Sequence, residues 1–422
     1  MKIYKFGGAS VKDAEGVRNV KKVLEATGET NLVVVVSAMG KTTNLLEQVV
    51  TAYLEDNTSA LHDHISTFHT YHFNILHALF PNSVHPIFQR VSDIFNEMSS
   101  FLKRNRSKKH SFLYDQIVCF GELVSTTIVA TYLSEAGIQN TWLDVRNCII
   151  TNNYYRDAKV DWSITQQRIQ ELVAPNGITI TQGFLGSESD NNFTTTLGRE
   201  GSDYTAAIFA YCLNSESVTI WKDVPGVLNA DPRYFSKTTL LHTISYTEAI
   251  ELAFYGASVI HPKTLQPLQR KEIPLYVKSF VDPNAPGTCV GKGELLDPMV
   301  SCFILKPNLV LLSLSSLDFS FMMEDNISDV FRWLHEYKMK VELIQNSAIS
   351  FSVCVNDKYH KLTPLLKKLK ETFKVVCEPE VTLYTVRHSA SEDIKALTKG
   401  KEVLLKQENL STVQIVVADK TT

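Results

Sequence analysis

Residues 1 to about 290 alternate β-rich apolar runs with helical stretches, and this alternation constrains the fold more than any other feature. Alternating strands and helices favour an α/β fold with a mostly parallel sheet between helices. The clearest predicted strands are residues 2–6, 32–36, 141–144, 177–182 and 218–221. Residues 56–112 are polar and helical in pattern, so we expect a helical excursion from the sheet there.

The pattern changes after a Pro-, Asn- and Gly-rich linker at residues 283–286. The residue pattern beyond the linker predicts six elements in order. They are a strand at 309–315, a helix at 327–338, strands at 341–345 and 349–355, a helix at 361–373 and a strand at 381–386. This βαββαβ order is the ferredoxin-like plan. A shorter unit follows, with a helix at 392–398 and strands at 403–406 and 412–417, and residues 299–305 could supply its first strand.

Composition excludes several classes of protein. The chain is 44% hydrophobic and 21% charged, and it has no apolar run near the roughly 18 residues of a membrane span. No signal-peptide pattern precedes Gly7, so we expect a cytoplasmic protein. The seven cysteines are scattered without a C-x-x-C pair, and a net charge of −3 without a basic stripe makes nucleic acid an unexpected partner.

Two predicted strands end in small residues. Lys5-Phe6-Gly7-Gly8 would let phosphate oxygens approach backbone N–H groups, with Lys5 in reach of a phosphoryl group, although two glycines are often only a tight turn. Gly40-Lys41-Thr42 invites a P-loop interpretation, which fails because position 35 is valine. The hydroxyl groups around Thr43 fit donors to a bound anion, with a turn and helix cap as the structural alternative.

Four later segments also carry polar groups. Glu122 lies in a segment that we expect to open a helix, where a carboxylate often only complements the helix dipole. Gly198-Arg199-Glu200-Gly201-Ser202-Asp203 combines glycines, a guanidinium and a carboxylate at a helix start, which favours anion recognition. Residues 221–233 and 254–262 could be ordinary strand-to-turn passages.

In order and spacing, these six segments closely resemble the aspartate kinases of the amino acid kinase superfamily. That family opens with K-F-G-G-T-S and carries T-N-x-L, G-E-x-x-S, G-R-x-G-S-D, D-V-x-G ending in D-P-R, and G-A-x-V-x-H-P. The resemblance implies an amino acid kinase domain at residues 1–290 and a tandem ACT regulatory region at 299–422. The first ACT domain would span about 307–387 and the second about 299–306 plus 388–422.

The same resemblance implies the site residues. Lys5 and Asp203 would be catalytic, with Lys5 stabilising charge on the transferring group. The acceptor, L-aspartate, would be held by Thr43, Glu122, Arg199 and Ser202, with Glu122 on the α-ammonium and Arg199 on a carboxylate. ATP, accompanied by Mg²⁺, would contact Lys5, Phe6, Gly7, Gly8, Lys222, Asp223 and Arg233. The reaction would form 4-phospho-L-aspartate for lysine, threonine and methionine biosynthesis.

The chain departs from the family at several positions. Ala9 replaces a usual threonine, Ser258 stands where many members have a lysine that contacts the nucleotide, and Lys222 occupies a position often held by threonine. We hypothesise that Lys222 compensates for the lysine missing at position 258. No dinucleotide fingerprint follows, so we expect a monofunctional enzyme without a fused homoserine dehydrogenase.

Alternatives remain at this stage. His62, His69 and His72 could share a helix face, but a zinc site would want a defined ligand set, so we predict no metal site there and a solvated helical surface. A kinase acting on another small carboxylate and a catalytically silent amino-acid sensor are the rival functions. Lysine or threonine would be the effector, and a homodimer or higher homo-oligomer through the ACT domains is the expected assembly.

Overall fold

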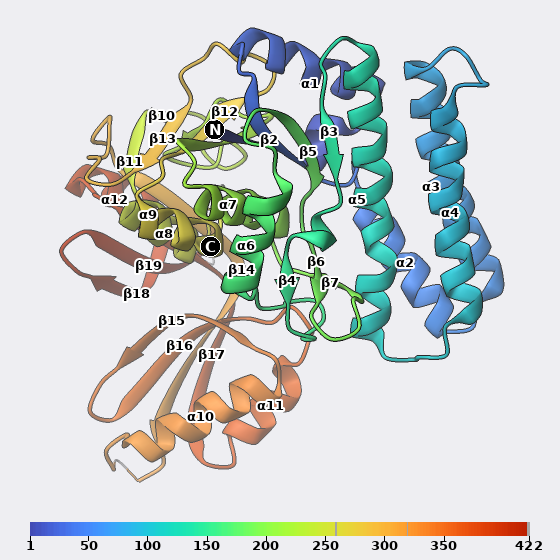
Figure 1. The fold of residues 1–422 in the computed structure, drawn as a ribbon. Helices are drawn as coiled ribbons and strands as arrows, with labels where there is room; N and C mark the ends of the chain where they lie inside the picture. The colour runs from blue at the N-terminus through green and yellow to red at the C-terminus, as the bar shows by residue number, and fades with distance from the viewer. Residues whose placement is uncertain (258–259, 319, 420–422) are drawn as a thin grey trace. The chain divides into compact units, whose positions relative to one another are not determined.

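The computed structural model describes residues 1–257, 260–318 and 320–419 (Figure 1). These residues form two compact units. The first contains Met1–Val227, Leu240–Ile250 and Val259–Asp297, and the second contains Leu228–Thr239, Glu251–Ser258 and Pro298–Thr422. Helix α8 (Tyr246–Tyr255) runs from the first unit into the second.

The first unit is built on an eight-stranded sheet. Its spatial order is β11 (Thr243–Ser245), β13 (Thr288–Gly291), β12 (Leu275–Ser279), β8 (Ser217–Lys222), β1 (Lys2–Phe6), β2 (Asn31–Val36), β5 (Gly177–Gln182) and β3 (Thr141–Leu143). All neighbouring pairs are parallel except the antiparallel pair of β12 and β13. The predicted mostly parallel sheet is confirmed, and each of the five expected strands is present.

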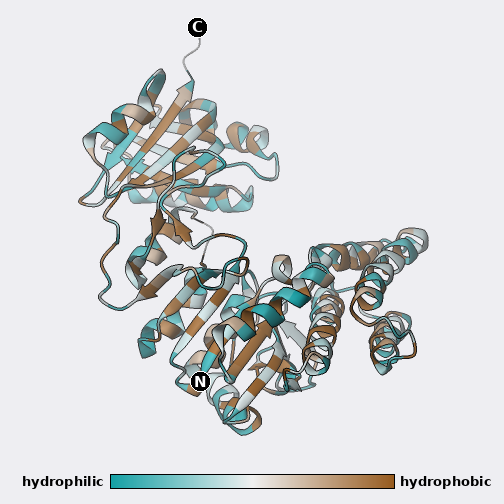
Figure 2. Cartoon of the chain, turned by 90° about the horizontal axis from the view of Figure 1, so that it is seen from above, coloured by the Kyte–Doolittle hydropathy of each residue, from teal (hydrophilic) through white to brown (hydrophobic). Residues whose placement is uncertain are grey.

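Strand β2 shows why the sheet centre forms here. Its five residues from Leu32 to Val36 are all fully buried, because helices cover both faces of a central parallel strand. Each such side chain contributes roughly 1.5–3 kcal/mol when it leaves water. Figure 2 shows apolar residues along strands of the sheet.

Two sets of helices surround this sheet. Helices α6 (Trp162–Leu172), α7 (Gly201–Leu213) and α9 (Pro262–Lys271) pack together. The other set comprises α1 (Ala14–Thr27), α2 (Thr42–Leu54), α3 (Thr58–Leu79), α4 (Pro86–Arg104) and α5 (His110–Glu135). Helices α3 and α4 confirm the predicted helical excursion. A small sheet of β4 (Ile150–Thr151), β6 (Leu185–Glu188) and β7 (Thr194–Thr196) completes the unit.

Helix α5 is long and apolar enough to cross a membrane by length and composition alone. From the sequence we expected no apolar stretch near the length of a membrane span, and α5 shows that this expectation was too strict. However, 78% of its most apolar 18-residue window is buried inside the protein, as in the central helix of a folded core. One such helix is weak evidence for a membrane span.

The predicted solvated histidine surface is wrong at one position. The His72 side chain on α3 is fully buried, with its ring edge against Phe68 and Nδ1 2.8 Å from the Phe68 carbonyl oxygen. Burial lowers the pKa of His72 to about 4, so the ring is neutral. His72 therefore belongs to an aromatic core between helices, because α3 turns this face toward Phe95 on α4.

The second unit contains one six-stranded antiparallel sheet in the order β15 (Lys340–Asn346), β16 (Ser350–Asn356), β14 (Cys302–Ser316), β17 (Phe373–Arg387), β19 (Thr412–Asp419) and β18 (Lys401–Glu408). The separate strands predicted at 299–305 and 309–315 are in fact two halves of β14, joined at Asn308, which has a positive φ of 58°. A register shift there turns the strand without ending it. The two ferredoxin-like halves thus share β14 and β17.

Helices α10 (Glu324–Glu336) and α11 (Leu362–Leu369) pack on the first half of this sheet over one apolar core, which includes Val330, Trp333, Leu365 and Phe373. The βαββαβ order predicted for this half is confirmed. In the second half, α12 (Ser391–Thr398) precedes β18 and β19. Residues 420–422, the end of the predicted second ACT domain, lie outside the described residues.

Candidate active site

A cavity of about 660 Å³ lies where β1, β2 and β5 end. Parallel strands place their carboxyl ends along one edge of the sheet, which is where α/β proteins bind ligands. Seven residues predicted for the site line this cavity: Lys5, Gly8, Thr43, Glu122, Arg199, Ser202 and Asp203. The structure thus brings together residues separated by almost 200 positions of sequence.

The loop after β1 requires glycine at position 8. A Cβ atom there would lie 2.7 Å from the Gly40 carbonyl oxygen and 2.8 Å from that of Ala38. The Gly8 carbonyl in turn accepts a hydrogen bond of 3.0 Å from the Gly40 N–H. The loops after β1 and β2 therefore meet backbone to backbone, and this contact shapes the cavity wall.

Lys5 and Asp203 form the charged centre of the cavity. The Lys5 ammonium lies 2.5 Å from Asp203 Oδ1, and a Cβ atom on Gly7 would lie 3.3 Å from the same ammonium. Asp203 is fully buried, and among the described residues neither of its oxygens has a partner in good hydrogen-bond geometry. We therefore treat the contact as an ion pair, in which Asp203 holds the lysine over the glycine loop.

Ser202 and Asp203 stand in the first turn of α7, which packs against the end of β5. A Cβ atom on Gly183 would lie 2.4 Å from Ser202 Oγ, so glycine is required for this close approach. Thr205 Oγ1 accepts a hydrogen bond of 2.9 Å from the Phe184 N–H. The helix start is thereby fixed at the cavity, as the sequence predicted.

Arg199 lies just before α7 and is exposed. Within the described part of the chain its guanidinium forms no ion pair, although acidic residues line the same cavity. A guanidinium presents a planar fork of donors that matches a carboxylate. Arg199 is therefore available for an anionic ligand.

Glu122 does not open a helix, which corrects the prediction. It lies in the middle of α5, where the macrodipole has little effect, so the helix-dipole alternative is wrong as well. The side chain is 2% exposed, and Oε2 has no hydrogen-bond partner among the described residues. Burial raises the pKa of Glu122 to about 8, opposed by backbone hydrogen bonds from Glu122 and Ala38. A bound cation would satisfy this buried carboxyl group.

Two residues predicted for the nucleotide lie at the end of the strand on the other side of β1. Phe6 pairs in register with Trp221 of β8, so Lys222 is the last residue of that strand and Asp223 follows it directly. Neither residue is among the described lining of the cavity. The Phe6 side chain is fully buried and stacked on Trp221, which leaves only its main chain to face a ligand.

Two further positions lie outside the described part of the first unit. Arg233 belongs to the second unit, where its guanidinium is ion-paired with Asp231 at 2.5 Å. Ser258 lies outside the described residues.

Sequence reasoning missed Phe184 of the lining, and it also missed the contacting pair Tyr114 and Arg156. Arg156 follows β4 in a loop, and its guanidinium lies 4.0 Å from the centre of the Tyr114 ring on α5. Neither residue belongs to a recognisable motif. The only sequence signal for Arg156 was its positive charge within the polar loop 152–157.

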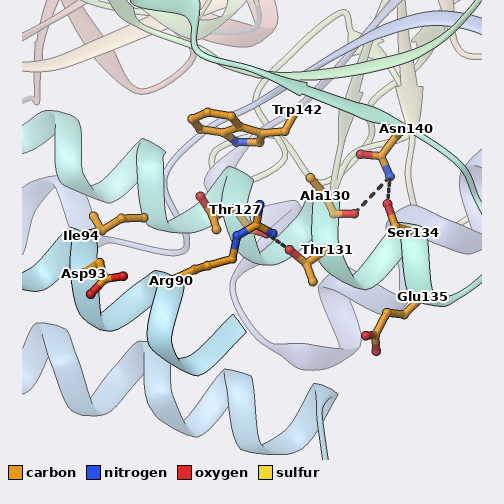
Figure 3. Close-up of a pocket in the computed structure, with 10 residues that line it drawn as sticks. All are labelled: Arg90, Asp93, Ile94, Thr127, Ala130, Thr131, Ser134, Glu135, Asn140 and Trp142. Atoms are coloured by element: carbon orange, nitrogen blue, oxygen red, sulfur yellow. Dashed lines mark hydrogen bonds between the residues drawn. The ribbon is translucent and has the colours of Figure 1, made fainter. Parts of the chain in front are cut away.

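A second cavity of about 620 Å³ lies between α4, α5 and β3 (Figure 3). Its acidic residues are already engaged, since Glu135 contacts His85 and Asp93 accepts a hydrogen bond from Gln89. Asn140 donates hydrogen bonds to the Ala130 carbonyl and Ser134 Oγ. None of the predicted site residues lines it. Across the described residues there is also no group of three or more His, Cys, Asp or Glu side chains that could hold a metal ion.

The fold and the first cavity together define a kinase of small molecules. The amino acid kinase family model matches residues 1–279. Lysine-sensitive aspartokinase 3 of Escherichia coli (strain K12) is 33% identical over 412 residues, covering 95% of this chain and 89% of that protein. The chain therefore belongs to the amino acid kinase family and, within it, to the aspartokinases.

Solved structures agree. Aspartokinase III of Escherichia coli in complex with lysine and aspartate matches with a TM-score of 0.82 and 29% identity, covering 99% of this chain and 96% of that one. The same enzyme in complex with aspartate and ADP matches with a TM-score of 0.80 and the same identity and coverage.

Proposed function

We propose that this chain is an aspartate kinase, which transfers the γ-phosphoryl group of ATP to the β-carboxylate of L-aspartate. The proposal rests on one observation: an acidic and a basic side chain, each without an ionic partner among the described residues, line the same cavity. Glu122 is a buried carboxyl group that lacks a cation, and Arg199 is a guanidinium that lacks an anion among the described residues. An amino acid with a free ammonium and a carboxylate fits this pair.

The order of strands separates the roles of the two sides. The proposed aspartate ligands surround the ends of β2 and β5, and they are Thr43, Glu122, Arg199 and Ser202. Lys222 and Asp223 lie instead at the end of β8. Lys5 lies at the end of β1, between these sides. A phosphoryl group that passes from ATP to aspartate would therefore cross in front of the Lys5 ammonium.

The chemistry needs little from the protein beyond positioning and charge neutralisation. The β-carboxylate is already ionised at neutral pH, so no general base is required for in-line attack on the phosphorus. The attack forms the new carboxyl O–P bond as the bond from phosphorus to the bridging oxygen of ADP breaks. Lys5 would stabilise charge on the transferring oxygens, while Asp203 keeps the ammonium in place.

ATP would bind as its magnesium complex. Phosphate oxygens would be the main ligands of Mg²⁺, and the exposed carboxylate of Glu200 in the same cavity is of a kind that Mg²⁺ also accepts. The ion would neutralise part of the phosphate charge. Gly7 and Gly8 offer backbone N–H groups to the phosphates, and the resemblance to aspartate kinases adds Arg233 as a predicted phosphate ligand.

The C-terminal unit is proposed to regulate the enzyme. Its shared sheet of two ferredoxin-like halves suits ACT domains, and a homologous structure contains lysine together with aspartate. We infer that an amino acid, lysine or threonine, binds there and that the unit joins subunits into a homodimer or higher homo-oligomer. Such an enzyme would work in the cytoplasm.

The test is turnover of Mg·ATP with aspartate, glutamate, acetylglutamate and UMP in turn, with hydroxylamine present to trap any acyl phosphate. We expect trapping with aspartate alone and its loss in Arg199→Ala. Turnover with a different acceptor would overturn the substrate while leaving the family intact. Absence of turnover with any acceptor would favour an amino-acid sensor.

A further inference from the structure

We propose that Arg156 is a specificity-determining residue that binds the second carboxylate of the acceptor. This inference rests on the proposed function and deepens it, since it explains why a dicarboxylic amino acid would be chosen. Arg156 lines the same cavity as Glu122 and Arg199. Its position, its environment and the charge of aspartate each support this role.

The main chain of Arg156 is held in an unusual conformation by a buried carboxylate. Arg156 has a positive φ of 70°, a backbone conformation that residues other than glycine rarely adopt. Both oxygens of Asp115 accept from its N–H, at 3.2 and 3.1 Å. The remaining acceptor capacity of Asp115 goes to the Thr196 N–H and hydroxyl group, both at 2.8 Å. A fully buried side chain thus anchors this loop at the cavity.

The guanidinium lies on the acceptor side of the cavity. It stacks over the ring of Tyr114, with its carbon 4.0 Å from the ring centre. Tyr114 and Glu122 are eight residues apart on α5, so they lie on the same helix face, about two turns apart. Arg156 therefore belongs with Glu122, and not with the glycine loop after β1.

The present partner of Arg156 is easily replaced. Arg156 Nη2 lies 3.1 Å from Glu47 Oε1, and the two side chains are 42% and 45% exposed. Exposed ion pairs of this kind contribute little, since water competes for both charges. A guanidinium has five N–H donors, so a ligand carboxylate could bind without displacing the stacking on Tyr114.

Charge counting leaves one role open. Aspartate carries an ammonium, which Glu122 would hold, and two carboxylates, of which Arg199 would hold one. Lys5 is paired with Asp203, and the proposed function assigns it to the phosphoryl group. Arg156 is the remaining cation in the described lining, and the second carboxylate is the remaining charge of the ligand.

The test compares three variants in steady-state kinetics. Arg156→Gln should raise KM for aspartate roughly 10- to 100-fold, as expected for a lost hydrogen bond to a charged group. The contact is assigned to the α-carboxylate, which does not react, so it would form equally in the ground state and the transition state. Therefore kcat and KM for ATP should change little. Arg156→Lys should restore part of the affinity. Arg156→Gly tolerates the positive φ, so it reports on the side chain even if the glutamine variant folds poorly.

Glu47→Gln is the matched control. It removes the same ion pair, yet it leaves Arg156 free for the ligand, so KM for aspartate should stay unchanged or fall. A purely structural ion pair would make the Glu47 and Arg156 variants behave alike, and that result overturns the inference. Equal KM values for Arg156→Gly and wild type would also overturn it. Wild-type protein that fails to phosphorylate aspartate would instead refute the proposed function itself.

Discussion

Burial raises the pKa of Glu122 to about 8, so we expect the free protein to hold this side chain mostly as a neutral acid at pH 7. Ammonium binding favours the carboxylate form, so aspartate should release close to one proton per site as it binds near neutral pH. Its apparent affinity should accordingly weaken as pH falls below about 8. Calorimetry of aspartate binding at pH 7, in two buffers of different ionisation enthalpy, measures the proton directly.

Glu122→Gln provides the control for this prediction. The variant should release no proton and bind aspartate far more weakly. Its folding should not suffer, because a carboxyl group whose folded pKa is raised costs stability: the cost builds up as pH rises from the ordinary pKa of 4.5 to the folded pKa of about 8, and it is fully present above that pH. At pH 9 the variant should therefore unfold at the same or a higher temperature than wild type. Aspartate binding without proton release by the wild type would exclude the assigned role of Glu122.

Lys222 carries a second residue-level prediction. If it compensates for the lysine that Ser258 replaces, then Lys222→Thr should raise KM for ATP markedly and leave KM for aspartate nearly unchanged. Steady-state kinetics with each substrate varied at saturation of the other separates these effects. An unchanged KM for ATP would exclude compensation.

The sequence predicted site residues well where they belong to motifs and poorly where they do not. Lys5, Arg199 and Asp203 were predicted because glycines and charges occur together around them. Glu122 was recognised by its segment but placed in the wrong part of a helix, since the preceding apolar stretch is itself helical. Arg156 was missed because its contacts with Asp115 and Tyr114 are made across 41 and 42 positions of sequence.

At the scale of elements, the backbone contact between the loops after β1 and β2 yields a third prediction. Gly8→Ala would drive a methyl group into two carbonyl oxygens, so the loops must separate and the phosphate site should fail. We expect a large loss of kcat/KM for ATP with a native fold by circular dichroism.

Gly28→Ala is its control. Gly28 ends α1 with a φ of 64°, and no atom lies within 4 Å of the position that an added methyl group would occupy. This variant should lose about 1 kcal/mol of stability from the strained backbone while keeping wild-type kinetics. Equal kinetic losses in both glycine variants would mean that the effect of Gly8 is one of stability alone.

Strand β14 shows where element prediction reached its limit. The two apolar runs around Asn308 have strand patterns, and the Pro307-Asn308 pair between them has the composition of a turn. Pairing with β17 on both sides of Asn308 keeps the strand continuous. Tertiary pairing thus overrode a local turn signal. The three helices of the C-terminal unit, whose pattern is local, were predicted to within four residues of their observed bounds.

For the whole molecule, the proposed regulation requires coupling between the C-terminal unit and the active site. Binding of an effector and of aspartate must alter each other by the same factor. We expect lysine or threonine to raise the aspartate concentration needed for half-saturation, and aspartate to weaken binding of the same effector equally. Titrations in both directions measure the coupling; no effect of either amino acid would exclude this regulation.

The most direct test of the account is the identity of the product formed from Mg·ATP and aspartate. Hydroxylamine converts an acyl phosphate into a hydroxamate, and NMR distinguishes the β-aspartyl from the α-aspartyl isomer. We predict the β-aspartyl hydroxamate from the wild type and none from Arg199→Ala. The α isomer, or ADP formation without any hydroxamate, would contradict phosphoryl transfer to the β-carboxylate in this cavity.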